Sequence, residues 1–330
     1  MNPKKTFSKI GLAFSVYTVL LTFLSIAVVS LTDNFISDDI NIKLLFSFLI
    51  QYAIMMPLLI YILSALPKAD IKRYKLKIKD FIKLFIMLAP LSTAGNILGR
   101  LLNGIISKLA NIPVLDVMSI LFMRVNPVIL IIFVGIIGPI MEEFITRKIL
   151  IDRTVQYGEG VAILLSAGIF SLMHGNFFQS FYAFFLGGCF SYIYIRTGRL
   201  RYSTIMHILI NSSSIFLMTA LRGSGLSEYI GTSSENIATD PLFIQSLSKT
   251  NMFFIIIIML YLIIYLALII AGIVLWILHY RSIKINGGLL SNEDNKSKAK
   301  IMFVNVGMII FILISVYNFA DSIFLISSRL

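Results

Sequence analysis

Residues 128–143 read VILIIFVGIIGPIMEE, an apolar run that ends in two adjacent glutamates, Glu142 and Glu143. A charged side chain in the middle of a bilayer costs about 3 kcal/mol even on the lowest estimates, so an ionisable residue there marks a candidate functional site. Two of the three histidines, His174 and His207, also lie within apolar segments. The stretch therefore predicts a membrane-spanning helix that carries part of a buried polar site.

The composition is that of a polytopic membrane protein. Of 330 residues, 58% are hydrophobic and only 13% are charged, whereas a soluble domain is about half apolar and about a quarter charged. Runs such as 252–276 exceed the roughly 20 apolar residues that cross a bilayer. The sequence predicts an all-α transmembrane helix bundle of eight to nine spans, at 11–30, 44–65, 82–102, 126–146, 160–177, 179–196, 203–221, 252–279 and 301–325.

The net charge of +12 is concentrated beside the apolar segments. Most Lys and Arg residues fall in the connectors 67–83, 147–153, 196–201 and 280–300. With a cytoplasmic N-terminus, the positive-inside rule places every one of these connectors on the cytoplasmic side. No basic face interleaved with aromatic residues is present, so we expect membrane lipid rather than nucleic acid as a partner.

Glu142 and Glu143 have different surroundings on a helix. Glu143 and Arg147 are four residues apart and share a face, whereas Glu142 points elsewhere. An Arg147–Glu143 pair makes burial of Glu143 tolerable and leaves Glu142 to act as a general base. Pro139 is expected to distort the helix and to free backbone carbonyls near the site. The alternative is an interfacial pair that extends to the inner headgroups.

The histidine segments supply further polar groups. Phe170 precedes His174 by one helical turn, and His207 shares a face with Asn211. An imidazole orients water, binds a metal or donates to an oxyanion, and the Asn211 amide donates without acting as a base. The alternative for each histidine is an interhelical hydrogen bond. At 1.5 Å per residue, Glu142 lies about 8 Å and His174 about 20 Å from the inner ends of their predicted spans. A single site requires tilt, a later start of the fifth span or a longer fourth span.

Three motifs on successive spans carry a family resemblance. They are Glu142-Glu143-x-x-x-Arg147, Phe170-x-x-x-His174 and His207-x-x-x-Asn211. In this order they resemble the motifs of the CAAX-protease and bacteriocin-processing (CPBP) family, also called Abi or Rce1-like. The resemblance covers about 125–220. Thr146 stands where this family often has Phe, and Lys148 where it often has a small residue.

The resemblance implies a glutamate-dependent intramembrane endopeptidase, commonly classed as a metalloprotease. Carried onto this chain, Glu142 and His174 would activate water, and His207 and Asn211 would stabilise the oxyanion. Glu143 and Arg147 would give structural support. Glu142, His174 and His207 could also complete a three-ligand site for a divalent metal such as zinc, whereas activation of water by Glu and His alone needs the same residues.

This reading divides the chain into N-terminal transmembrane helices at 1–124, a CPBP-like catalytic core at 125–221, and an outer loop with C-terminal transmembrane helices at 222–330. The expected substrate is a membrane-associated peptide or protein, presented from the cytoplasmic side. An Ile-, Lys- and Asn-rich composition suggests a bacterial cell membrane. A non-catalytic binding or immunity protein that uses the same cavity stays open as an alternative, as does a proton-coupled transporter.

Overall fold

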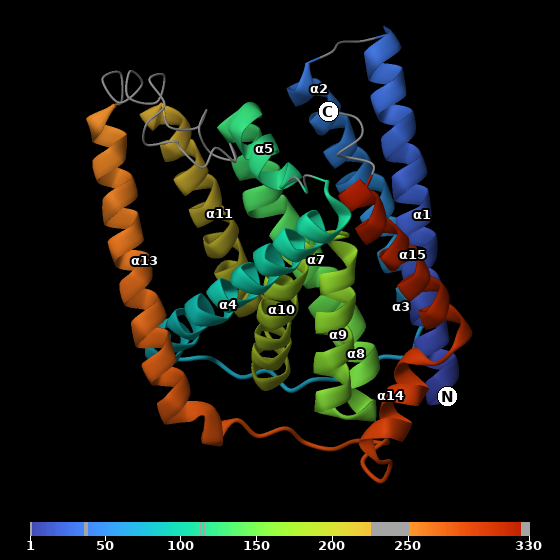
Figure 1. The fold of residues 1–330 in the computed structure, drawn as a ribbon. Coiled ribbons are helices and arrows are strands. Elements are labelled where there is room, and N and C mark those ends of the chain that lie inside the picture. The colour runs from blue at the N-terminus through green and yellow to red at the C-terminus, as the bar shows by residue number, and fades with distance from the viewer. Residues whose placement is uncertain (1, 36–38, 113, 115, 226–250, 325–330) are drawn as a thin grey trace.

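A computed structural model describes residues 2–35, 39–112, 114, 116–225 and 251–324, and these are helical with short connections (Figure 1). The all-α fold class is confirmed. In chain order the elements are α1 (Pro3–Phe35), α2 (Ile40–Leu49), η1 (Ile50–Met55), α3 (Met56–Ser64), α4 (Ile78–Ala110), α5 (Val117–Arg124), α6 (Pro127–Leu130), η2 (Ile131–Ile137), α7 (Gly138–Glu143), η3 (Phe144–Ile149), α8 (Leu150–Thr154), η4 (Val155–Tyr157), α9 (Glu159–Met173), α10 (Phe177–Thr197), α11 (Leu200–Ser224), α13 (Met252–His279), η7 (Tyr280–Ser282), α14 (Asn295–Phe303) and α15 (Val306–Phe324).

Seven helical stretches of the described chain are long and apolar enough to cross a membrane: 3–32, 40–64, 78–110, 127–157, 200–224, 252–282 and 306–324. Each corresponds to one of the nine predicted spans. The other two predictions, 160–177 and 179–196, form the shorter apolar helix α9 and the helix α10. The chain is thus a polytopic α-helical membrane protein.

The fourth predicted span is wrong at its C-terminal end. It was expected to stop at residue 146, with 147–153 as a basic connector, but the helix continues to Tyr157. The charged side chains of the supposed connector have partners inside the protein. Lys148 donates to Asp152 at 2.6 Å, and Arg153 donates to the carbonyl of Leu63 at 2.6 Å. Because these charges have partners within the protein, the helix does not need to end at them.

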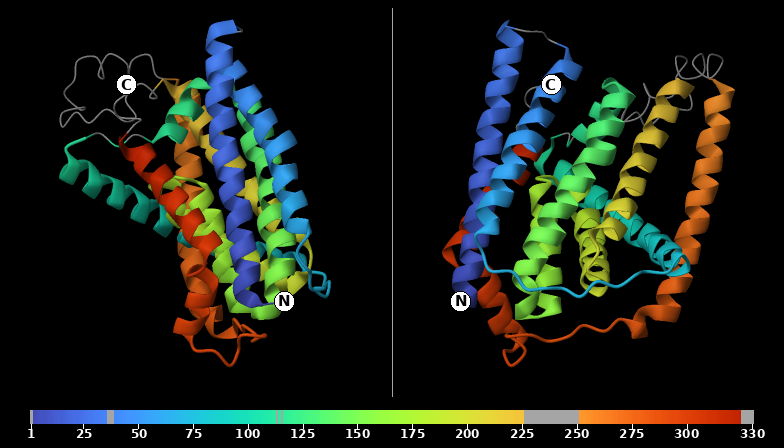
Figure 2. Two further views of the ribbon diagram at one scale, coloured as in Figure 1. Left: turned by 90° about the vertical axis from the view of Figure 1, so that its right-hand side faces the viewer. Right: turned by 180° about the vertical axis from the view of Figure 1, so that it is seen from behind.

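The helices α9 and α10 form a hairpin within the bundle. α9 starts near the end of the molecule that holds the N-terminus, and the chain turns at about mid-height before α10 runs back (Figures 1 and 2). Gly175 makes the turn with a positive φ of 64°, and Asn176 caps α10 by accepting from the Gln179 N–H. The hairpin therefore places His174 in the interior rather than at a surface.

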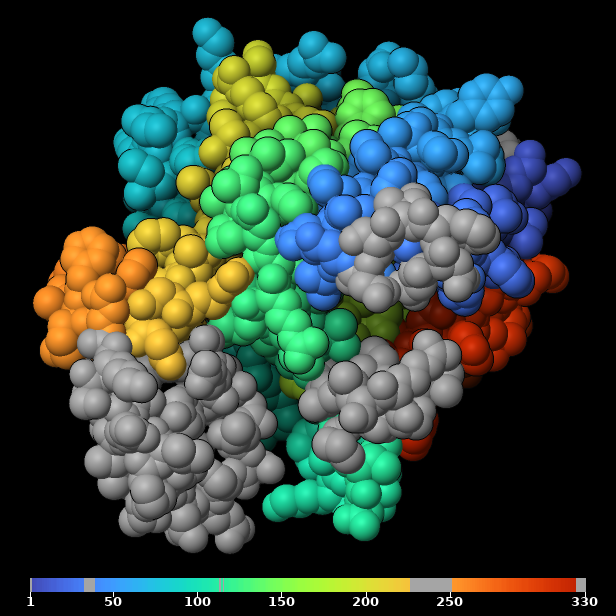
Figure 3. Space-filling view, turned by 90° about the horizontal axis from the view of Figure 1, so that it is seen from above, coloured from blue at the N-terminus to red at the C-terminus, as the bar shows by residue number. Residues whose placement is uncertain are grey.

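The remaining basic segments lie together at one end. The N-terminus, the 65–77 connection and the segment between α13 and α14 all lie at the lower end in Figure 1. Seen from the opposite end, α13, α11, α5, α2 and α1 follow one another across the molecule (Figure 3). This grouping agrees with the predicted clustering of positive charge, and a cytoplasmic N-terminus stays a prediction.

Close packing fixes the hairpin against α4. Gly95 and Gly99 face the first turns of α10, where an added Cβ would collide with the backbone of Tyr182 and of Phe177. Small residues spaced four apart allow helix backbones to approach closely in membranes, where packing rather than the hydrophobic effect holds helices together. The position of the turn that carries His174 therefore depends on these two glycines.

We predict that Gly99→Leu destabilises the protein by about 1–3 kcal/mol, because the obstructing atoms belong to backbone and cannot rotate away. The measurement is thermal unfolding of the purified protein in detergent. Gly104→Leu is the matched control, since a Cβ at Gly104 meets nothing within 4 Å. Equal melting temperatures for the two variants would contradict the assigned contact.

Candidate active site

The helix that carries Glu142 is widened on both sides of the glutamates. The segments η2 and η3 are π-helical and flank α7. Gly138 donates to the carbonyl of Phe133, five residues earlier, and Pro139 has no N–H with which to continue this pattern to Val134. The Val134 carbonyl instead accepts from Asn211 Nδ2 at 3.0 Å. The carbonyl freed by Pro139 thus ties α11 to this helix.

An ion pair lies directly behind the site. Arg147 Nε is 3.3 Å from Glu143 Oε2, and neither side chain has exposed surface. Arg147 also donates to Thr146 Oγ1 and, at 3.4 Å, to the carbonyl of Gly187 in α10. Its guanidinium carbon is 4.6 Å from the centre of the Phe170 ring. The predicted pairing of Arg147 with Glu143 is present, and it links three helices.

His207 lies between the two glutamates. Its Nδ1 is 3.2 Å from Glu143 Oε1, and its Nε2 is 3.7 Å from Glu142 Oε2. The ring stacks on Phe190 with centroids 5.4 Å apart. A carboxylate paired with Arg147 only accepts hydrogen bonds, so Glu143 places the hydrogen of His207 on Nδ1 and turns Nε2 toward Glu142.

His174 is oriented by its own helix. Its Nδ1 is 2.7 Å from the carbonyl oxygen of Phe170, which only accepts, so Nδ1 carries the hydrogen. Nε2 is then the nitrogen that accepts a proton. The Phe170 ring makes edge contacts with both imidazoles, with centroids 4.9 Å from His174 and 5.7 Å from His207. The phenylalanine of the second motif therefore spaces the two histidines.

Glu142, His174, His207 and Asn211 all line one cavity of about 370 Å³. The Glu142 side chain is partly exposed, at 21% of its surface, whereas that of Glu143 is fully buried. The depth mismatch expected from the sequence disappears. Glu142 precedes the helix end at Tyr157 by about 20 Å, and His174 follows the start of α9 by about 20 Å. The longer fourth helix accounts for this agreement.

The segment that supplies this arrangement has known relatives. Residues 124–213 match the family described as type II CAAX prenyl endopeptidase Rce1-like. This segment of the chain is therefore similar to the Rce1-like family. The chain is also 36% identical over 90 residues to the membrane-embedded CAAX protease MroQ of Staphylococcus aureus (strain USA300).

The alignment with MroQ covers 25% of this chain and 36% of the relative, so the chain spans about a third of the length of the curated relative that it matches. No solved structure matches it. All six predicted site residues lie inside the Rce1-like segment. The cavity also has walls outside that segment, on α1, η1 and α15.

The three possible metal ligands, Glu142, His174 and His207, line the same cavity. Among the described residues, no three His, Cys, Asp or Glu side chains are grouped closely enough to hold an ion. His207 Nδ1 already bonds Glu143, and His174 Nδ1 already bonds the Phe170 carbonyl. Glu142, His174 and His207 as a zinc site therefore stay a prediction, and we derive no step through a metal.

Sequence reasoning did not place Thr146 in the buried network. Thr146 was noted only as a departure from the family pattern. Its hydroxyl donates to the Glu142 carbonyl at 2.6 Å, and its own carbonyl accepts from Ser166 at 2.8 Å. The signal in the sequence was the substitution itself: a threonine, which can form hydrogen bonds, stands beside the buried arginine where the family often has phenylalanine.

Sequence reasoning also missed the wall of the cavity outside the Rce1-like segment. Tyr17, Gln51 and Tyr52 line the cavity from α1 and η1. Gln51 lies inside an apolar predicted span, and that position could have marked it. The tyrosines have no local pattern that separates them from other aromatic residues of the spans.

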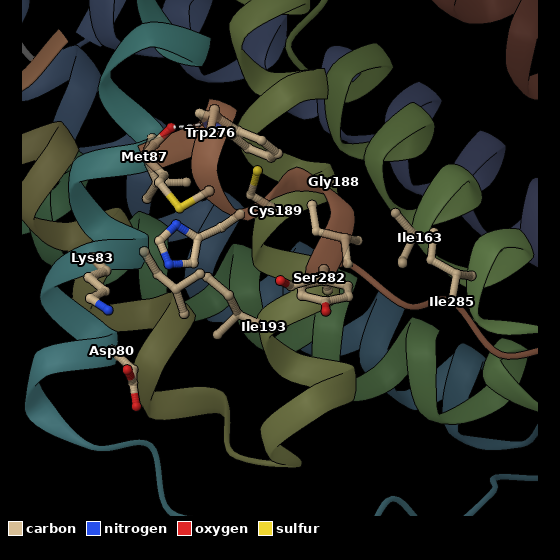
Figure 4. Close-up of a pocket in the computed structure, with 15 residues that line it drawn as sticks. Asp80, Lys83, Met87, Ile163, Gly188, Cys189, Ile193, Trp276, Ser282 and Ile285 are labelled. Atoms are coloured by element: carbon tan, nitrogen blue, oxygen red, sulfur yellow. Dashed lines mark hydrogen bonds between the residues drawn. The ribbon is translucent and has the colours of Figure 1, made fainter. Parts of the chain in front are cut away.

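A cavity of about 400 Å³ lies on the other side of α10 and holds none of the predicted site residues. It is lined mainly by apolar side chains of α4, α10 and α13, with Asp80 and Lys83 toward one end (Figure 4). The single cysteine, Cys189, lies beside Trp276 there. Size alone therefore does not identify the site in this protein.

We predict that Arg147→Met costs about 3–5 kcal/mol of stability, because Glu143 is then left charged, buried and unpaired. Thermal unfolding in detergent measures the effect. The double variant Glu143→Leu/Arg147→Met should recover much of the loss, since it removes both charges.

Arg100→Met is the control, because the Arg100–Asp116 pair has its arginine 61% exposed. It should cost less than about 1 kcal/mol. The assigned role of the buried pair fails if Arg147→Met melts like Arg100→Met.

Proposed function

We propose that this protein is a glutamate-dependent intramembrane endopeptidase that hydrolyses membrane-associated peptides or proteins. The observation that supports this most strongly is the convergence of Glu142, His174, His207 and Asn211 on one cavity inside a helix bundle. The Rce1-like segment and the similarity to a membrane-embedded CAAX protease point to the same reaction class. We further propose a bacterial cell membrane as its location.

Water activation is assigned to Glu142 and His174. The Glu142 carboxylate faces the cavity, and Arg147 forms its ion pair with Glu143 instead. Glu142 can therefore take a proton from a water molecule. The Nε2 lone pair of His174 accepts a hydrogen bond from the same water and fixes its direction. The water oxygen attacks the peptide carbonyl carbon, and the proton is later delivered to the leaving nitrogen as the C–N bond breaks.

Oxyanion stabilisation is assigned to Asn211 and His207. One N–H of the Asn211 amide bonds the Val134 carbonyl, which leaves the other to donate into the cavity. His207 donates through Nε2 when that atom carries a proton, and Glu143 holds the ring in the required direction from Nδ1. Glu143 and Arg147 are thus positioning residues. A positioned donor of this kind is worth about 10²–10³ in kcat.

We predict that Glu142→Gln lowers the rate of peptide hydrolysis by about 10²–10⁴, the usual contribution of a general base. The test uses purified protein in liposomes and a pool of apolar peptides, with products identified by mass spectrometry. The variant should keep the melting temperature of the wild type, because the substitution preserves shape at a partly exposed side chain.

The control is Glu293→Gln in the segment that precedes α14, far along the chain from the motif residues. Unchanged products with Glu142→Gln would exclude the proposed base. If the wild type itself yields no product with any peptide while the protein is folded, a non-catalytic binding role gains support.

We also predict that the hydrolysis rate does not depend on a bound metal ion. The water-activation scheme uses only protein groups, so dialysis against EDTA should leave the hydrolysis rate within about twofold of the untreated enzyme. Elemental analysis of the same samples reports any bound zinc directly. Loss of activity on dialysis that Zn²⁺ restores would replace this scheme with one in which the metal activates water.

A further inference from the structure

Two further cavities lie along α11 next to the catalytic cavity, which is the cavity lined by Glu142. A space of about 160 Å³ shares with the catalytic cavity the lining residues Met118, Val134, Gln179, Tyr182 and Asn211. It shares with a third space, of about 500 Å³, the residues Ser92, Asn96, Ile210 and Ser214. The smallest space therefore lies between the other two. Together they extend from Glu142, past Asn211, to the region between α4, α11 and α13.

The third space exists because α13 is held close to its neighbours at two separated points. Near one end, Gly272 is pressed against the backbone of α4 at Ile86, and near the other, the Phe254 ring is pressed against Gly223 of α11. Between these contacts, tyrosine hydroxyls bridge the space: Tyr265 to Thr93 at 3.0 Å and Tyr261 to Ser213 at 3.5 Å.

The wall of this space is apolar on one side and hydroxyl-lined on the other. Leu209, Leu262 and Ile264 are exposed and open it to the surrounding lipid. Ser213 and Ser214 donate to the Ile210 carbonyl at 2.8 and 3.3 Å. A hydroxyl that donates to its own helix keeps its two oxygen lone pairs. Ser213 uses one of them to accept from Tyr261, so it can accept one more hydrogen bond, and Ser214 can also accept from a ligand.

We propose that the space between α4, α11 and α13 binds an extended apolar segment of the peptide substrate and leads its scissile bond past Asn211 to Glu142. This proposal rests on the proposed endopeptidase activity and adds the route and the class of substrate. The substrate is a peptide that lies within the lipid and enters from the side of the bundle.

The chemistry of the wall favours a peptide over an acyl chain. A peptide backbone in lipid needs a partner for each N–H, and the serine oxygens and the Asn96 amide supply such partners. An acyl chain gains nothing from them. Along α11 the space runs from Leu209 to Leu217, about 12 Å at 1.5 Å per residue. That length holds about four residues of extended chain at 3.3 Å each.

The experiment maps the position of a bound peptide by photocrosslinking. The probe is an octapeptide of leucine and alanine with a photoreactive benzoylphenylalanine near one end, added to the full chain carrying Glu142→Gln in phosphatidylglycerol liposomes. We expect crosslinks at 209–217 and 261–268, located by mass spectrometry. Crosslinks confined to α1 and η1, the opposite wall of the catalytic cavity, would overturn the route.

A matched pair of variants tests the junction between the spaces. Ser214 lines both outer cavities, so Ser214→Phe should lower the crosslink yield at 209–217 by about tenfold. Leu266→Phe lies on α13 outside the lining and is 57% exposed, so its yield should match the parent. Equal yields for both variants would overturn the proposal.

Further readouts distinguish the proposed peptide-binding route from the proposed endopeptidase activity. Photoreactive phosphatidylglycerol that labels 209–217 and is not displaced by the octapeptide would identify a lipid site and overturn the peptide assignment. Failure of the wild type to cleave any peptide would remove the proposed function while the crosslink map still reports where a peptide binds. Cleavage that Ser214→Phe leaves unchanged would keep the peptidase and overturn the route.

Discussion

The buried charge of Arg147 is the constraint around which the site is organised. A guanidinium is always protonated in proteins, so its burial requires an oppositely charged partner and acceptors for its hydrogen bonds. Glu143 supplies the charge, the Gly187 carbonyl and Thr146 accept hydrogen bonds, and Phe170 covers one face. Meeting these needs brings α9 and α10 against the helix that carries Glu142.

The same ion pair is connected to the proposed chemistry. Glu143 accepts from His207 through the oxygen that Arg147 does not contact, so the group that compensates the arginine also orients the histidine. Glu142, one residue earlier, points into the cavity instead. Two adjacent carboxylates thereby have different surroundings, and the difference arises from which face of the helix each occupies.

Much of this site follows from the sequence, and the reasons are physical. The Glu143–Arg147 pair follows from helical spacing, and the freed carbonyl near Pro139 follows from the missing N–H of proline. The sequence did not decide whether His174 and Glu142 lie at the same depth, because that depends on where the fourth helix ends. A count of charges placed that end at residue 146, whereas Lys148 and Arg153 find partners in the protein and let the helix continue. The partner of Arg153, the Leu63 carbonyl, lies 90 residues away and leaves no local pattern in the sequence, whereas Lys148 and Asp152 are four residues apart.

The half-depth hairpin has a consequence for how the protein is made. α9 has only 15 residues, less than the roughly 20 that hold a helix across a bilayer by themselves. Contacts with the rest of the bundle must therefore hold the turn at Gly175 at mid-height. Gly95 and Gly99 of α4 supply such contacts when they pack against α10. We expect the histidine-bearing turn to reach its position late in biogenesis, after the long helices have inserted. On the proposed function, a newly synthesised chain would then not cleave neighbouring membrane proteins until assembly is complete.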